Sequence, residues 1–279
     1  MRLRMVLLLV FAGLTGGLAA AEPAADLFRK GETQLAAGDL QGALQQFAGA
    51  VRGSPSNQQY MQQYAMLRQV LMMRASLPNE RVPAQWEYKA RALHTFYVSH
   101  GLYANALEIG EQLHDKLDNG SSALLLAETQ LAMNQPADAA DVLAALPAAR
   151  HTVATQALHG LAMARQGQPD AARQIAETIQ LSGNEGAGMV YAVARLYAAL
   201  GDGQRACQLL VRCFESALPS RLAGFKQHAQ TSPEFSSLSA DTRFVAALKT
   251  ASKVPESACS GGASCASCPM RGNCASSEN

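Results

Sequence analysis

Five segments of this chain repeat one short pattern, in which a turn residue is followed five residues later by alanine. Four of them read GDLQGALQQF (38–47), GLYANALEIG (101–110), GQPDAARQIA (167–176) and GDGQRACQLL (201–210). The aligned alanines lie at intervals of 63, 34, 32 and 34 residues and are Ala43, Ala106, Ala140, Ala172 and Ala206. A period near 34 residues is typical of stacked helical hairpins. The spacing therefore predicts an all-α fold built from repeated helix pairs.

Each alanine follows a helical stretch and then a residue that ends a helix. In the last repeat, for example, Val190, Val193 and Tyr197 recur at the spacing of one helical face. Four breaks carry a glycine, which adopts a positive φ at low steric cost: Gly38, Gly101, Gly167 and Gly201. The remaining repeat has Gln135-Pro136 at this place. We expect each alanine to lie where the two helices of a pair approach most closely.

Two repeats match a known signature especially well. The matching residues of the first are Leu27, Gly31, Gly38, Asp39, Leu40, Ala43, Phe47, Ala50 and Pro55. Those of the last are Val190, Ala194, Tyr197, Gly201, Asp202, Ala206 and Leu210. This pattern resembles the tetratricopeptide repeat (TPR) family over roughly residues 24–218. The resemblance implies a right-handed solenoid of stacked antiparallel helix pairs.

One repeat, near residues 58–86, is degenerate. The stretch QQYMQQYAMLRQVLMMRASL predicts a single long helix, and Pro78 and Pro83 follow it as helix breakers. We interpret its methionines, Met61, Met72 and Met73, as core packing, with an adaptable binding surface as the alternative.

Residues 219–250 are predicted to form capping helices at the end of the array. The segment 225–248 resembles the closing phrase of many TPR proteins, since SPEF is followed by DTRF. A solenoid end exposes apolar surface that needs a cap with a polar outer side. We expect this surface to be covered by Phe235, Leu238, Phe244 and Leu248.

The chain begins like an export signal over residues 1–21. Arg2 and Arg4 precede an apolar stretch from residue 5 to 18, and small residues follow up to Ala21. We expect cleavage after Ala21 and a periplasmic or secreted protein, with an uncleaved anchor as the alternative. No later segment is apolar enough to predict stable membrane insertion once the signal is removed.

Residues 251–279 predict a flexible, disordered Cys-rich tail. Its cysteines are Cys259, Cys265, Cys268 and Cys274, in a background of Ser, Gly and Ala that cannot form a core. Disulfides are the expected state in an exported protein, although the pairing cannot be chosen from the sequence. The alternatives are a metal or iron–sulfur site made by these four thiolates, and free or intermolecular thiols.

The sequence carries no motif that predicts catalysis. HExxH, GxGxxG, GxxxxGK[ST] and GxSxG are absent, and no cofactor is expected. The formal net charge is +1 and no block of Lys or Arg occurs. Nucleic acid is therefore not an expected partner, because phosphate neutralisation needs clustered cations.

The TPR resemblance also implies a peptide-binding groove lined by the first helix of each pair. The groove-facing positions would be Tyr88, Arg91, Thr95, Leu125, Thr129, Met133, Leu161, Arg165, Tyr191 and Arg195. The three arginines of this set suit an extended acidic or carboxylate-ended peptide.

These observations predict an exported, non-catalytic scaffold that binds another protein or an extended peptide through the concave face of a TPR solenoid. The alternative is a metal-binding or redox-active protein that uses the four-cysteine tail, with the repeats as the structural support of that tail.

Overall fold

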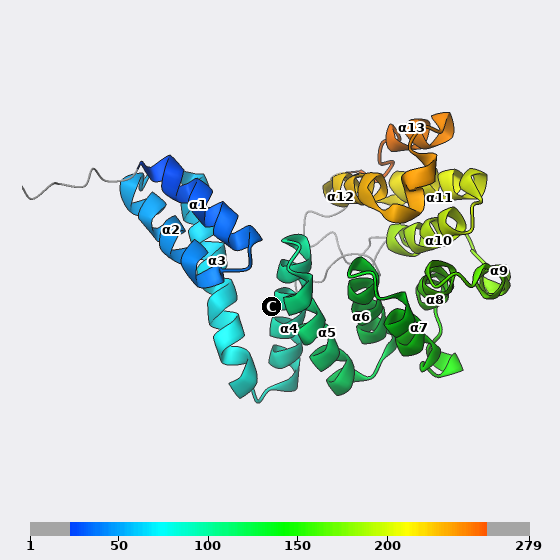
Figure 1. The fold of residues 1–279 in the computed structure, drawn as a ribbon, viewed down its shortest axis with the longest axis horizontal. Helices are drawn as coiled ribbons and strands as arrows, with labels where there is room; N and C mark the ends of the chain where they lie inside the picture. Colours follow the sequence, from blue (N-terminus) through cyan, green and yellow to red (C-terminus); the bar gives the residue numbers. More distant parts are fainter. Residues whose placement is uncertain (1–22, 256–279) are drawn as a thin grey trace, which may run out of the picture. The chain divides into compact units, whose positions relative to one another are not determined.

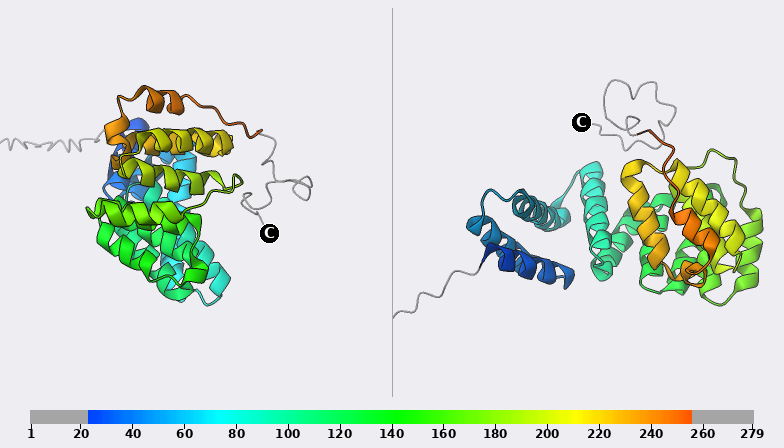
Figure 2. Two further views of the ribbon diagram at one scale, coloured as in Figure 1. Left: turned by 90° about the vertical axis from the view of Figure 1, so that its right-hand side faces the viewer. Right: turned by 90° about the horizontal axis from the view of Figure 1, so that it is seen from above.

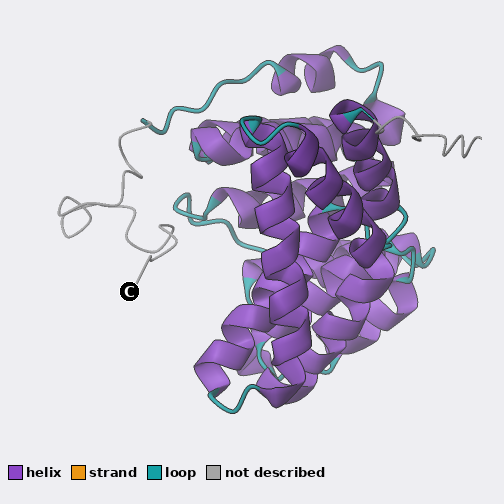
Figure 3. Ribbon diagram, turned by 90° about the vertical axis from the view of Figure 1, so that its left-hand side faces the viewer, coloured by secondary structure: helices purple, strands orange, loops and turns teal. Residues whose placement is uncertain are grey.

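The computed structural model describes residues 23–255. The predicted signal peptide and the four tail cysteines lie outside this range. Within it every secondary-structure element is a helix (Figure 3), as the sequence predicts. None of the described helices combines the length and the apolar character that crossing a membrane requires.

The chain divides into two compact units, one ending at Ala75 and one beginning at Ser76. Unit one contains α1 (Ala24–Ala36), α2 (Leu40–Gly53) and most of α3 (Gln58–Ser76). The Phe28 ring of α1 lies 5.2 Å from Phe47 of α2 and 4.6 Å from Tyr60 of α3. Gly31 allows this close packing, since a Cβ there would lie 2.5 Å from the Phe47 ring.

Unit two begins with the short 3-10 turn η1 (Leu77–Asn79) and continues through four helix pairs. The pairs are α4 (Pro83–Ser99) with α5 (Tyr103–Leu117), α6 (Gly120–Ala132) with α7 (Pro136–Ala144), α8 (Val153–Arg165) with α9 (Pro169–Thr178), and α10 (Ala187–Ala199) with α11 (Gly203–Ser216). A second 3-10 turn, η2 (Ala148–Arg150), joins α7 to α8. Each helix packs against its neighbour in sequence, and α8 also contacts α6 and α10 (Figures 1 and 2). This ordered stacking is that of a helical solenoid.

The turns inside the pairs form as the glycines predict. Gly38, Gly101, Gly167 and Gly201 all have φ between 71° and 82°. In the α6–α7 pair this conformation belongs to Asn134, with φ 57°, and Asn is the residue that most readily replaces glycine there.

The position of Asn134 at the turn changes the alignment of the repeats. The equivalent alanine lies three residues after the first residue of each second helix, as Ala43 does in α2. Since α7 begins at Pro136, this alanine is Ala139 and not Ala140. The alanine intervals after Ala106 then become 33, 33 and 34 residues, closer to one constant period. Both alanines are buried, so burial alone does not separate them.

The end of the stack is covered by α12 (Pro219–Thr231), the 3-10 helix η3 (Pro233–Leu238) and α13 (Thr242–Leu248). The rings of Phe235 and Phe244 lie 5.7 Å apart, and both are buried. Phe235 also approaches Tyr191 of α10, with ring centroids 6.2 Å apart. Leu238 and Leu248 pack against the same core while partly exposed. All four side chains therefore pack where the cap was expected, against the core of unit two.

The predicted packing of the α3 methionines is wrong for two of them. Met61 is 40% exposed and Met72 is 56% exposed, whereas Leu67 and Val70 of the same helix are buried. The helix is apolar on more than one side, so its sequence pattern does not identify the side that packs.

Candidate functional site

A pocket of about 510 Å³ in unit two opens on the face formed by its first helices, α4, α6, α8 and α10. We call this surface the first-helix face and the pocket the first-helix pocket. The C-terminal end of α12 and the start of η3 complete its wall. The lining residues are His94, Val98, Tyr103, Leu125, Glu128, Thr129, Leu131, Ala132, Asn134, Arg165, Arg195, His228, Thr231, Ser232 and Pro233.

A buried ion network lies beside this pocket and links it to the closing segment. Glu234 of η3 accepts from Arg165 Nη2 at 2.7 Å and from Arg195 Nη2 at 3.0 Å, both through Oε1. Arg195 Nη1 also donates to Glu128 Oε2 at 2.7 Å. Only 1% of the Glu234 side chain and 4% of the Arg195 side chain are exposed. The two repeats that carry the arginines are therefore tied to the cap through one carboxylate.

The network holds Glu234 in its ionised form. Burial by itself raises the pKa of this carboxyl, but the nearby guanidinium groups of Arg195 and Arg165 outweigh burial and leave the pKa below its ordinary value. Two arginines and two glutamates then balance in charge beside the pocket. A free acidic ligand therefore finds no uncompensated cation in this network.

The histidine on α4 is neutral and its tautomer follows from its contacts. Thr129 Oγ1 donates its single hydrogen to the Leu125 carbonyl at 3.0 Å. His94 Nε2, 2.8 Å from the same oxygen, must then be the donor. Burial and, second, the charge of Arg91 lower the pKa of His94 to about 4. The His94 ring is therefore an uncharged part of the pocket wall at neutral pH.

A second histidine joins α10 to the cap. His228 Nδ1 lies 2.7 Å from Tyr191 Oη and 2.9 Å from Ser232 Oγ. Burial, with Arg195 as the next cause, lowers the pKa of His228. This cluster therefore adds no positive charge to the pocket at neutral pH.

Four of the ten residues predicted from the sequence meet in the first-helix pocket: Leu125, Thr129, Arg165 and Arg195. Thr129 is almost wholly buried, and its hydroxyl is already bonded to His94. Of these four, Leu125 has the side chain that is most available to a ligand, since it is only partly buried and carries no polar group in need of a partner.

The structure places the other six elsewhere. Tyr88 and Thr95 are exposed on α4, and Met133 is half-buried at the end of α6. Leu161 is fully buried in the core of unit two, so its predicted place in a groove is wrong. Tyr191 is also buried, and the cap covers it through its contacts with Phe225 and Phe235.

The arginines do not form the predicted carboxylate-binding set. Arg91 pairs with Glu87 one turn earlier in α4, at 2.7 Å. Arg165 and Arg195 are paired with Glu234, as described above, and Arg165 Nη1 also donates to the Leu131 carbonyl at 2.8 Å. Carboxylates of the chain itself therefore pair with all three guanidinium groups. The prediction that these arginines bind an acidic peptide is corrected on this ground.

Sequence reasoning missed the contribution of the closing segment to the site. His228, Thr231 and Ser232 line the pocket, and Glu234 lies in the SPEF phrase that was interpreted only as a cap. One available signal was the pair of inward-facing arginines, because buried guanidinium groups need carboxylate partners. Glu234 supplies such a carboxylate, in the closing segment that is predicted to pack on the last repeat.

No protein-family model matches the chain, and no curated protein matches it. Among solved structures, it is similar to a thermophilic TPR protein of Thermus thermophilus, with 18% identity, TM-score 0.40, and coverage of 81% of this chain and 98% of that one. A TPR protein from Parabacteroides merdae shows 14% identity and TM-score 0.42, over 81% of this chain and 96% of that chain.

A third similar structure is YrrB, a TPR protein with an unusual peptide-binding site. It shows 17% identity and TM-score 0.33, over 73% of this chain and 91% of that chain. Because these identities and TM-scores are low, the fold assignment rests on the helix pairs of the structure itself.

Proposed function

We propose that this protein is an exported, non-catalytic scaffold that binds an extended segment of another protein in the first-helix pocket. The observation that carries the proposal is the pocket itself, which is about 510 Å³ and is lined by residues of four first helices and of the closing segment. That volume lies within the range of about 300–1,000 Å³ that is common for ligand pockets.

The lining favours an uncharged part of the partner. Val98, Leu125 and Ala132 supply apolar surface, and the ionised groups nearby are already paired with one another. An apolar side chain of the partner gains by leaving water, whereas a charged one loses its hydration without gaining a free counter-ion. The partner class is therefore revised from an acidic peptide to a segment that presents an apolar side chain.

Replacing Ala132 with Arg should block this pocket. Ala132 lines the pocket, is exposed and ends α6, so a long charged side chain enters the cavity with little disturbance of the core. We expect the mature chain to capture its partner from an extract of its own compartment, and Ala132→Arg to reduce capture at least tenfold. Quantitative mass spectrometry of the captured proteins measures this.

Ala137→Arg is the matched control, because Ala137 is also exposed, on α7, but does not line the pocket. Capture should be unchanged in this variant. If Ala132→Arg captures the same proteins in the same amounts as the unaltered chain, the first-helix pocket is not the binding site.

The competing function, metal or redox chemistry on the tail, rests on Cys259, Cys265, Cys268 and Cys274. We expect these four to be oxidised to disulfides in the exported protein. The two remaining cysteines, Cys207 and Cys213, are buried and reduced. Alkylation under denaturing conditions without reductant should therefore modify two of the six thiols, with no bound zinc or iron by elemental analysis. Six modified thiols, or one metal ion per chain, would favour the competing function.

A further inference from the structure

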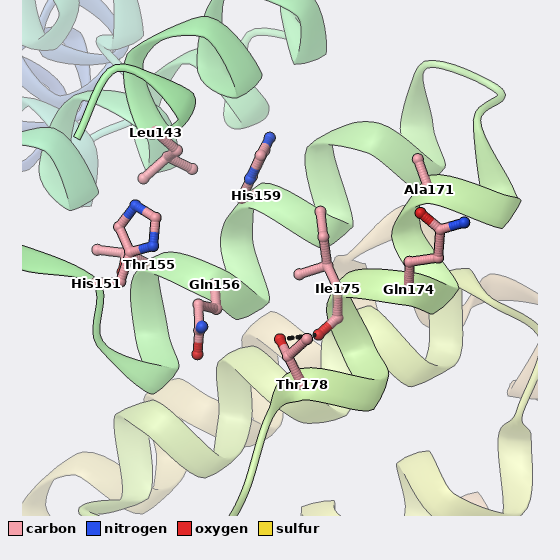
Figure 4. Close-up of a pocket in the computed structure, with 9 residues that line it drawn as sticks. All are labelled: Leu143, His151, Thr155, Gln156, His159, Ala171, Gln174, Ile175 and Thr178. Atoms are coloured by element: carbon pink, nitrogen blue, oxygen red, sulfur yellow. Dashed lines mark hydrogen bonds between the residues drawn. The ribbon is translucent and has the colours of Figure 1, made fainter. Parts of the chain in front are cut away.

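A second depression lies between the second helices α7 and α9, with α8 at its base. It has a volume of about 410 Å³, and Leu143 of α7 and Ile175 of α9 form opposite walls (Figure 4). Gln156 and His159 of α8 and Gln174 of α9 also line it. We call it the second-helix groove; it shares no lining residue with the first-helix pocket.

The groove exists because two second helices are short. α7 has 9 residues and α9 has 10, whereas α5 has 15 and α11 has 14. At about 1.5 Å per residue, the missing turns shorten each helix by about 6–9 Å. Antiparallel pairing places the first turns of α8 beside the C-terminal ends of α7 and α9. The turns that would cover this part of α8 are therefore absent.

The side chains exposed in this way are polar but uncharged. No Asp, Glu, Lys or Arg is among the described residues that line the groove. Burial and, second, the neighbouring His151 lower the pKa of His159, so its imidazole is neutral at neutral pH. The groove therefore offers no counter-ion to a phosphate, a carboxylate or an ammonium group.

Several of these polar groups retain their hydrogen-bonding capacity. Within the described part of the chain, the side chains of Gln156, Gln174 and His159 have no hydrogen-bond partner. Two other polar lining residues already have partners within the chain. His151 Nε2 is hydrogen-bonded to the Leu146 carbonyl, and Thr178 Oγ1 donates to the Ile175 carbonyl. Two free primary amides thus flank an apolar strip that contains Ile175 (Figure 4).

We propose that the second-helix groove binds an extended, uncharged polypeptide segment through its main chain. A primary amide carries both a donor and an acceptor, so Gln156 and Gln174 can each pair with the N–H and C=O of one peptide unit. Ile175, whose side chain is partly exposed, would contact an apolar side chain of the segment. A metal ion is a poorer occupant, because the described residues include no group of three potential ligands. The chain would then hold two segments at once, one on each set of helices.

The test uses a random heptapeptide library displayed on phage and selected against the full mature chain carrying Ala132→Arg, so that the first-helix pocket is blocked. Selected peptides are synthesised, and their affinities are measured by fluorescence anisotropy. We expect peptides without charged residues at their central positions. Gln156→Ala/Gln174→Ala should weaken their binding at least tenfold.

The matched control is Gln204→Ala/Gln208→Ala, which removes two exposed glutamines from another second helix, α11. It should bind the selected peptides as tightly as the parent chain. The proposal is wrong if no peptide is selected, or if the selected peptides bind the Gln156→Ala/Gln174→Ala chain with unchanged affinity. Because the selection does not use the first-helix pocket, its outcome is independent of the proposed function.

Discussion

Replacing Glu234 with Gln is expected to lower the free energy of unfolding of unit two by about 3–5 kcal/mol. The substitution keeps the shape of the side chain but removes the charge that Arg165 and Arg195 share. Arg195 retains Glu128 as a partner but stays buried, and Arg165, which is only 15% exposed, loses its carboxylate. An uncompensated buried charge is among the most destabilising single changes. Chemical denaturation followed by circular dichroism measures the effect.

The exposed pair of Arg173 and Asp170 supplies the control. Its two side chains lie within 2.6 Å of each other on α9 but are largely in solvent, where such a pair contributes about 0–1 kcal/mol. Asp170→Asn should therefore change stability little. Equal effects of Asp170→Asn and Glu234→Gln would mean that the closing segment is not held by its ion network.

The same network predicts a dependence on pH. Because the folded-state pKa of Glu234 lies below its ordinary value of 4.5, the unfolded state binds more protons than the folded state in acid. The stabilisation is complete above the ordinary value and is lost as the pH falls through the lowered folded-state pKa. The stability difference between the parent chain and Glu234→Gln should accordingly be constant near neutrality and shrink in acid.

The parts of this molecule that could be predicted from sequence are those with local causes. A glycine in the left-handed region ends a first helix, as at Gly167, and this signal needs no knowledge of the rest of the chain. Pro147, three residues after the end of α7, likewise predicts the early end of that helix. α9 is nearly as short although no proline follows it closely, and the sequence pattern does not predict its length.

The candidate sites depend on contacts that a sequence does not display. Glu234 lies 69 residues from Arg165 and 39 from Arg195, and only the packing of the cap brings the three together. The TPR resemblance also implied that Leu161 faces the groove. It packs in the core instead, because α8 has neighbours on several sides, α6, α7, α9 and α10. A helix packed in this way has no single apolar face for a periodicity argument to identify.

The second large expected effect is a loss of stability on enlarging one of the recurring alanines. Ala106→Leu should destabilise unit two by about 1–3 kcal/mol, because Ala106 is fully buried in α5, which packs on both α4 and α6. Ala104→Leu, on the exposed side of the same helix, should stay within about 0.5 kcal/mol of the parent. Alanine and leucine are both strong helix formers, so the difference between the two variants reports packing rather than helix propensity. Thermal and chemical denaturation of both variants measure it. If Ala106→Leu is as stable as Ala104→Leu, close approach at the alanine does not explain why the residue recurs at every turn of the array.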